Sequence, residues 1–143
     1  MTKRKKTLDH RLAAYSQSHR HPVNRVIHTV CVPAILFAII AFLWDLHLFG
    51  LRVAYLLMVL VAPFYVWLGL KAVGVMAAQL LACVLILSLW PRALPLIDTS
   101  IAIFVLAWIG QFVGHAIEGR RPKFFQDITF LLIGPLWVVL KTR

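Results

Sequence analysis

Five long apolar stretches dominate this chain and restrict the folds open to it. Apolar residues make up 62% of its 143 residues and charged residues 14%, whereas soluble domains have roughly 45–50% and 25%. A helix of about nineteen residues rises about 28 Å, enough to cross the hydrocarbon core of a bilayer. The sequence therefore predicts an all-α, polytopic membrane bundle in a single domain over residues 1–143, with a basic N-terminal interfacial segment at 1–25 and the helical bundle at 26–140. The stretches are Val26–Trp44, Leu51–Leu70, Ala72–Trp90, Ser100–Ile117 and Ile128–Leu140.

The two ends of the chain are predicted to differ from the four central spans, which we expect to be transmembrane helices. The last stretch, residues 128–140, rises only about 20 Å, so it is predicted as a short re-entrant or interfacial helix or as a fifth span. Near the N-terminus, Leu8, Leu12 and Tyr15 recur at helical spacing. This spacing favours a short amphipathic helix on the membrane surface, with a frayed tail as the alternative.

The positive charge of the chain is concentrated beside the apolar stretches. The formal charge is +10, and seven of the fifteen Lys and Arg residues lie between Lys3 and Arg25. A nucleic-acid surface would spread basic residues over a folded face, so no nucleic-acid partner is predicted. With the N-terminus inside, four crossings and a re-entrant tail, only Arg52 and Arg92 lie outside. The positive-inside rule thus predicts an integral membrane protein with a cytoplasmic N-terminus, in the inner membrane if the chain is bacterial.

Two clusters of polar residues lie at the cytoplasmic ends of the predicted first and fourth spans. Imidazole, carboxamide and carboxylate groups cost free energy to bury unless a partner satisfies them. Within each cluster the spacing of three or four residues places side chains on one helix face, and facing polar stripes are how helical bundles build metal sites. Histidine suits Fe, Zn, Cu or Ni, and an added carboxylate favours non-haem Fe(II). The clusters are His19, His21, Asn24 and His28, and Gln111, His115 and Glu118.

Two other interpretations of these clusters remain open at the level of sequence. In one, His28 and His115 are the axial ligands of a b-type haem. In the other, the protein is a non-catalytic lipid-binding or scaffold protein whose histidines only make interfacial hydrogen bonds. A haem requires no Glu118, and a scaffold requires no convergence of polar groups, so the metal site is preferred. The sequence predicts no particular oligomeric state.

Two glycines and two arginines lie next to the second cluster in the sequence, at the end of the fourth span. Gly110 and Gly114 form a small-x3-small pair, which is typical of close helix packing. Arg120 and Arg121 are interpreted as positive-inside anchors at the interface. Their place beside Glu118 also suits them to bind a carboxylate substrate or a lipid headgroup.

At these clusters the sequence resembles the 2-hydroxy fatty acid dioxygenase family, small membrane proteins that include a fungal endoplasmic-reticulum enzyme and bacterial homologues. The resemblance covers nearly the whole chain. It rests on the patterns H-x4-N-x3-H-x4-P and QFxGH, the second followed by Glu and by two basic residues and Pro. In this chain the patterns are Tyr15, His19, Asn24, His28 and Pro33, then Gln111–His115, Glu118 and Arg120-Arg121-Pro122.

The resemblance implies an Fe(II)-dependent membrane dioxygenase of fatty acid α-oxidation, which shortens a long-chain 2-hydroxy acid by one carbon with O2. Such an acid fills two of six octahedral positions and O2 a third, which leaves three for the protein. We expect His19, His28 and His115 as ligands.

Further roles follow from the same resemblance. Glu118 is expected as an additional ligand or as the base that deprotonates the α-hydroxyl. His21 and Asn24 are expected to support catalysis by orienting the ligands. The residues expected beside the substrate are Gln111, Arg120 and Arg121.

Overall fold

The chain folds into helices joined by one short β-hairpin. The computed structural model describes residues 3–122, 125 and 127–140, with the backbone alone at residues 3–6. The predicted all-helical class is confirmed for this part of the chain. Three basic residues used to predict the orientation, Lys123, Lys141 and Arg143, lie outside the described residues. The elements are α1 (Lys3–Ser16), α2 (Pro22–Trp44), β1 (His47–Leu48), β2 (Leu51–Arg52), α3 (Val53–Leu68), α4 (Leu70–Ser88), α5 (Leu96–Glu118) and α6 (Thr129–Leu140).

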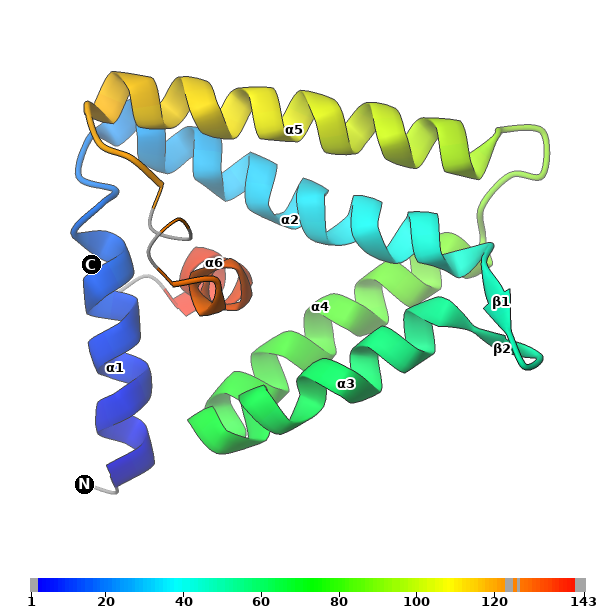
Figure 1. Ribbon diagram of the computed structural model, residues 1–143, viewed down its shortest axis with the longest axis horizontal. Coiled ribbons are helices and arrows are strands. Elements are labelled where there is room, and N and C mark those ends of the chain that lie inside the picture. The colour runs from blue at the N-terminus through cyan, green and yellow to red at the C-terminus, as the bar shows by residue number, and fades with distance from the viewer. Residues whose placement is uncertain (1–2, 123–124, 126, 141–143) are drawn as a thin grey trace.

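Helices α2 and α5 are the longest and lie side by side along the molecule (Figure 1). A Cβ atom added to Gly110 would lie 2.7 Å from the Cys31 sulfur, and one added to Gly114 would lie 2.3 Å from the Asn24 side-chain oxygen. No side chain fits at such distances, so both glycines are needed where the helices touch. The predicted close packing at this pair is confirmed. Because Asn24 lies at the contact, the same packing brings the two polar clusters together.

Helices α3 and α4 form a second pair that follows the hairpin. The hairpin takes the first residues of the predicted second span, so α3 begins at Val53 and holds sixteen residues. Gly69, whose φ of 111° suits a residue without a side chain, separates α3 from α4. In the described part of the chain, three helices are long and apolar enough to cross a membrane, namely α2, α4 and α5. A crossing by the shorter α3 therefore stays a prediction.

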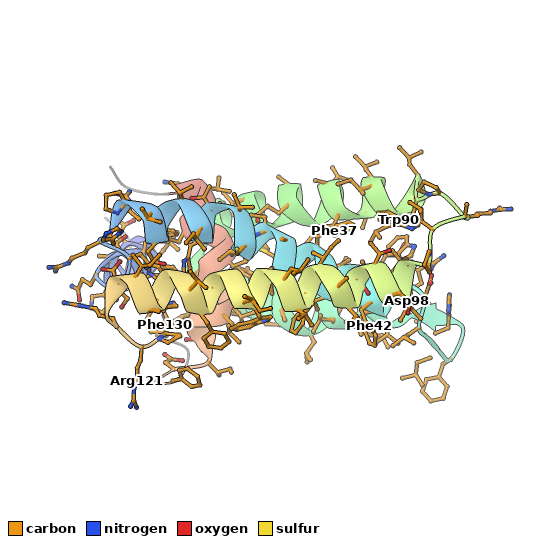
Figure 2. All side chains as sticks on the ribbon, turned by 90° about the horizontal axis from the view of Figure 1, so that it is seen from above. Phe37, Phe42, Trp90, Asp98, Arg121 and Phe130 are labelled. Carbon is orange, nitrogen blue, oxygen red and sulfur yellow. The ribbon has the colours of Figure 1, made fainter. Side chains whose placement is uncertain are left out.

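Helix α6 lies crosswise to α2 and α5. Figure 1 views α6 nearly along its axis, and Figure 2 views it from the side, where α5 runs across it. Its side chains Ile133, Leu136 and Trp137 are buried in the protein. When α2 and α5 cross a bilayer, a helix placed across them runs along the membrane plane. This arrangement favours the re-entrant or interfacial alternative over a fifth crossing.

Helix α1 also lies crosswise, and its apolar face packs on protein. Leu8, Leu12 and Tyr15 are buried against α3 and α6. Arg11 strengthens this docking, because its guanidinium donates to the Thr129 hydroxyl at 2.7 Å and lies 3.6 Å from the Asp127 carboxylate. The helix is confirmed, and the alternative of a frayed tail is wrong. The expected lipid contact of its apolar face needs correction, because α6 and α3 occupy that face.

The outward faces of the long helices are strongly apolar. Val30 on α2, Leu60 on α3 and Leu106 on α5 are 66%, 76% and 68% exposed. Continuous apolar surface of this kind is unstable in water and marks contact with lipid. The fold therefore supports membrane association, with the polar clusters at one end of the α2–α5 pair.

Candidate metal centre

Three histidines from three segments meet at the end of the bundle. His19 lies between α1 and α2, His28 on α2 and His115 on α5, and all three are buried. One ring nitrogen of each lies within 4.8 Å of the others. The Nε2 atoms of His28 and His115 are 3.2 Å apart, and the His19 ring centroid lies 4.3 and 5.1 Å from theirs. The packing of α1, α2 and α5 thus gathers imidazoles far apart in the sequence.

Backbone carbonyls fix the protonation of two of these rings. The Nδ1 atom of His19 lies 2.7 Å from the Tyr15 carbonyl oxygen, and that of His28 lies 3.1 Å from the Asn24 carbonyl oxygen. A carbonyl oxygen only accepts, so each Nδ1 carries the proton and each Nε2 presents a lone pair. This arrangement is typical of metal-binding histidines.

The group has more lone pairs than protons to satisfy them. Nε2 of His19 and Nδ1 of His115 are buried and have no hydrogen-bond partner in the part of the chain that the structure describes. A buried nitrogen without a partner costs free energy, which a divalent cation would offset at His19 Nε2 by accepting its lone pair. The Nε2 atoms of His28 and His115, 3.2 Å apart, are close enough to bind the same ion. The three residues therefore fit a metal ion.

His19 is held in the state that metal binding needs. Burial, more than any other cause, lowers the pKa of His19 to about 4, so its ring is neutral at pH 7. The Tyr15 ring stacks on it with centroids 4.3 Å apart and an interplanar angle of 6°. Tyr15 therefore positions His19 twice, through its ring and through its carbonyl. Sequence reasoning missed this contact, for which the spacing of four residues was the available signal.

The distance between the ring nitrogens of His28 and His115 bears on whether the site suits a single metal ion or a haem. Ligands at right angles around one ion, with bonds of about 2.1 Å, lie about 3 Å apart. Axial ligands on opposite sides of a haem iron lie about 4 Å apart. The 3.2 Å between His28 and His115 agrees with neighbouring positions on one ion and disfavours the haem alternative.

Glu118 lies beside this group but is not a member of it. Its carboxylate accepts hydrogen bonds from the backbone N–H groups of Arg20 and His21, at 3.0 and 2.8 Å, and from the Asn24 amide at 3.1 Å. The end of α5 is thereby tied to the start of α2 and to the segment that carries His19. The sequence predicted a ligand or a base here, whereas the structure gives the carboxylate three donors in the protein.

Asn24 and His21 act on the site at different distances. Asn24 is fully buried and holds His28 through its carbonyl and Glu118 through its amide. His21 is exposed, and its Nδ1 accepts a hydrogen bond from the Val23 N–H, which caps the start of α2. The structure therefore brings Asn24 to the histidine group but leaves the His21 side chain outside it.

The three residues predicted to contact the substrate also differ in how close they lie to the site. Gln111 is buried beside His115 and lines the large cavity described below. Arg120 donates to the Gln17 carbonyl oxygen at 3.1 Å. Arg121 is exposed and points away from the bundle, as Figure 2 shows. Neither arginine lines the large cavity.

An apolar cavity of about 410 Å³ extends from the histidines into the bundle. Tyr15, His19, Gln111 and His115 line it, and the rest of its wall is largely aliphatic or aromatic. Sites of about 300–1,000 Å³ with a few placed polar groups are typical of small-molecule binding. The lining suits an apolar molecule with a polar group at one end. Its apolar walls include Ile35, Leu57, Met76, Phe104, Trp108 and Leu132.

Comparison with known proteins gives the family. The family described as 2-hydroxy-palmitic acid dioxygenase Mpo1-like matches residues 5–143. This chain belongs to the Mpo1-like family. The 2-hydroxy-palmitic acid dioxygenase MPO1 of Saccharomyces cerevisiae is 29% identical over 133 residues, which cover 91% of this chain and 76% of the yeast protein. No solved structure matches. The resemblance seen in the sequence is confirmed, and the histidine group with its cavity is the candidate active site of this Mpo1-like chain.

Proposed function

We propose that this protein is an Fe(II)-dependent dioxygenase that shortens long-chain 2-hydroxy fatty acids by one carbon in the membrane. One observation carries the proposal: three buried histidines bring one ring nitrogen each within 4.8 Å of the others, beside an apolar cavity. The name of the yeast relative, a 2-hydroxy-palmitic acid dioxygenase, supplies the substrate class.

In this proposal His19, His28 and His115 hold the ion. Bound Fe(II) supplies the reaction with O2, and three protein ligands leave positions for the substrate. The protein excludes water from the group, because all three imidazoles are buried. Neutral rings with Nδ1 held by backbone carbonyls keep their lone pairs available at neutral pH.

Glu118, Asn24 and His21 are proposed to act by position. The Glu118 carboxylate ties the linker that carries His19 to α5, and Asn24 holds His28. We propose this role for Glu118 in place of that of a ligand or base, because its oxygens already accept three hydrogen bonds in the protein. His21 supports the same segment by capping α2.

The acyl chain is proposed to lie in the apolar cavity, with its hydroxyl-bearing carbon near the histidines and Gln111. A chain of methylene groups gains about 0.8 kcal/mol for each one removed from water, although a lipid environment offers the same gain. Binding from the bilayer therefore depends mainly on the polar head. Arg120 and Arg121, at the same end, are proposed to attract the acid to the membrane face.

The whole chain is proposed as one membrane domain with a cytoplasmic N-terminus. Helices α2, α4 and α5 cross, α3 makes the fourth crossing with help from the hairpin, and α1 and α6 lie along one face. An even number of crossings between α2 and the end of α5 agrees with the meeting of the histidines at one end.

The reaction balances without any external reductant. A 2-hydroxy acid and O2 give the acid one carbon shorter, CO2 and water; the substrate loses four electrons and O2 gains four. The test uses purified protein loaded with Fe(II), O2 and 2-hydroxypalmitic acid, with mass spectrometry of the products. We expect a fifteen-carbon acid, and its absence with fully loaded protein would refute the proposal.

A further inference from the structure

A second, smaller pocket adjoins His19. It encloses about 240 Å³ and is open to the surface at the end of the bundle. His19 lines both spaces and so forms part of the wall of each. The lining residues are Ser16, His19, Arg20, Arg25 and Trp137.

The two arginines of this pocket lack a partner for their charge. Among the described residues, neither the Arg20 nor the Arg25 guanidinium has a hydrogen-bond or ion-pair partner, and no acidic side chain lines the pocket. The nearby carboxylate of Glu118 accepts from the Arg20 backbone, not from its side chain. By contrast, Arg11 and Arg120 have partners in the protein. The pocket therefore presents unpaired positive charge next to the candidate active site.

His19 Nε2 has no hydrogen-bond partner among the described residues, whereas the Trp137 and Ser16 side chains are satisfied within the protein. The Trp137 indole N–H donates to the Ser16 hydroxyl at 2.7 Å, and that hydroxyl donates to the Leu12 carbonyl oxygen at 3.0 Å. The backbone of Arg25 is fixed by its N–H bond to the His21 carbonyl oxygen. Beside His19 Nε2, which the proposed function assigns to the metal ion, the groups of the pocket open to a ligand are the two guanidinium groups, which suit an anion.

We propose that this pocket binds the carboxylate of the fatty substrate, with Arg25 as the main contact and Arg20 as the second. The inference rests on the proposed function. In this proposal the chain of the acid lies in the apolar cavity, its carboxylate meets the arginines, and its second carbon lies beside His19, the residue that lines both spaces. A single-chain acid fits this pair of spaces, because one apolar cavity extends from His19. Arg25 also lies one helical turn before His28 on α2, which keeps charge and candidate ligand close.

The test measures binding separately from turnover. The ligands are palmitic acid, which has no 2-hydroxyl group, and hexadecanol, which has the same chain without the charge; both are titrated against the full-length protein in neutral detergent. Wild-type protein should prefer palmitic acid. Arg25→Gln should weaken palmitic acid binding by about tenfold and leave hexadecanol unchanged, as expected for loss of a charge-assisted contact. Arg25→Lys should keep part of the preference.

Lys71→Gln is the matched control, because Lys71 is an exposed cation that lines neither cavity. It should leave both affinities unchanged. The same ratio of affinities in Arg25→Gln as in the wild type would overturn the proposal. So would a preference for hexadecyl phosphate over palmitic acid that Arg25→Gln removes, since the pocket would then belong to a phosphate headgroup.

The iron content and the kinetics separate this inference from the proposed function. Arg25→Gln should raise the KM for 2-hydroxypalmitic acid by about tenfold while kcat and bound iron stay near wild type. Wild-type protein that prefers palmitic acid but releases no shortened acid would refute the function and keep the pocket. A shortened acid with an unchanged KM in Arg25→Gln would refute the pocket and keep the function.

Discussion

His19 is the residue on which the candidate site depends most. It belongs to no helix, yet it is buried, stacked on Tyr15 and hydrogen-bonded through Nδ1 to the Tyr15 carbonyl. It also lines both cavities. A loop residue fixed so closely loses little freedom when it binds a ligand, which makes it suitable as a metal ligand.

His115→Ala tests the metal group directly. The change removes one of three nitrogen donors, so we expect loss of stoichiometric iron and a fall in turnover of more than about 100-fold. Elemental analysis and product formation measure the two effects. His47→Ala is the control, because His47 is exposed in the hairpin and its ring contacts the Asp45 carbonyl oxygen, far along the sequence from the histidine group. Iron content equal to wild type in His115→Ala would contradict the ligand assignment.

Tyr15 offers a test of how His19 is positioned. Tyr15→Phe keeps the stacked ring and the carbonyl, so iron affinity should stay within about twofold of wild type. Tyr15→Ala keeps the carbonyl but removes the ring, and iron affinity should fall by about 10- to 100-fold, the usual effect of losing a group that orients a ligand. Competition with a chelator of known affinity measures both. Equal affinities in the two variants would mean that stacking has no part in the site.

Among the elements, the contact between α2 and α5 decides whether the two polar clusters meet. The contact is close because Gly114 leaves room for Asn24, whose carbonyl in turn holds His28. The carboxylate of Glu118 then ties the end of α5 to the same part of α2. The site is therefore assembled by helix packing and by hydrogen bonds across it.

Gly114→Ala should separate these helices. The added Cβ would lie 2.3 Å from the Asn24 oxygen, and relief of that overlap should destabilise the protein by about 1–3 kcal/mol and reduce bound iron. Gly74→Ala in α4 is the matched control, because nothing lies within 4 Å of its added Cβ. There the change should stabilise the helix by about 0.5–1 kcal/mol. Thermal unfolding in detergent measures both, and equal melting temperatures would contradict the packing argument.

Glu118→Gln distinguishes a positioning carboxylate from a ligand. The amide has one acceptor oxygen for three donors, so the linker should loosen and iron affinity should fall by about 10- to 100-fold. Because the three histidines remain, iron saturation at high concentration should restore turnover to within about tenfold of wild type. Saturated protein that stays inactive would instead indicate a direct role for the carboxylate in the reaction.

At the scale of the whole molecule, the helical bundle has two ends, and the histidine group lies at one of them. Figure 2 shows Asp98, at the start of α5, and Arg121, after its end, at opposite ends of the molecule. The histidine group lies near the second end, where α2 begins and α5 ends, and α1 lies there as well (Figure 1). In the proposed function, a fatty acid dissolved in the bilayer would therefore reach the site from within the membrane.

Single cysteines test this arrangement. In a Cys31→Ala, Cys83→Ala background, Asp98→Cys and Arg121→Cys should react with a membrane-impermeant thiol reagent from opposite sides of sealed vesicles. With a cytoplasmic N-terminus, Arg121→Cys should react only in inside-out vesicles. Mass shift on a denaturing gel measures the reaction. Labelling of both cysteines from one side would contradict the crossing of α5.

The local features of the fold follow from residues close together in sequence. Apolar runs of sufficient length predicted helices near α2, α4 and α5, because length and periodicity are local properties of a sequence. The glycine pair at positions 110 and 114 predicted close helix packing at its face of the fourth span. The hairpin that shortens α3 was missed, because Leu51 and Arg52 lie directly before the apolar run that forms α3 and were assigned to the second span.

The sequence by itself determined the apolar helices, the membrane class and the pool of polar residues from which a site could be built. Only the tertiary structure decided which of these polar residues meet in the histidine group and which bind elsewhere in the protein. His19 joins His28 and His115 because α1 docks on α6, whereas Glu118 meets backbone N–H groups because α5 ends beside the start of α2. The charged pocket of Arg20 and Arg25 depends on Trp137, more than a hundred residues away. Such contacts follow from how helices pack across the bundle, which spacing along the chain does not specify.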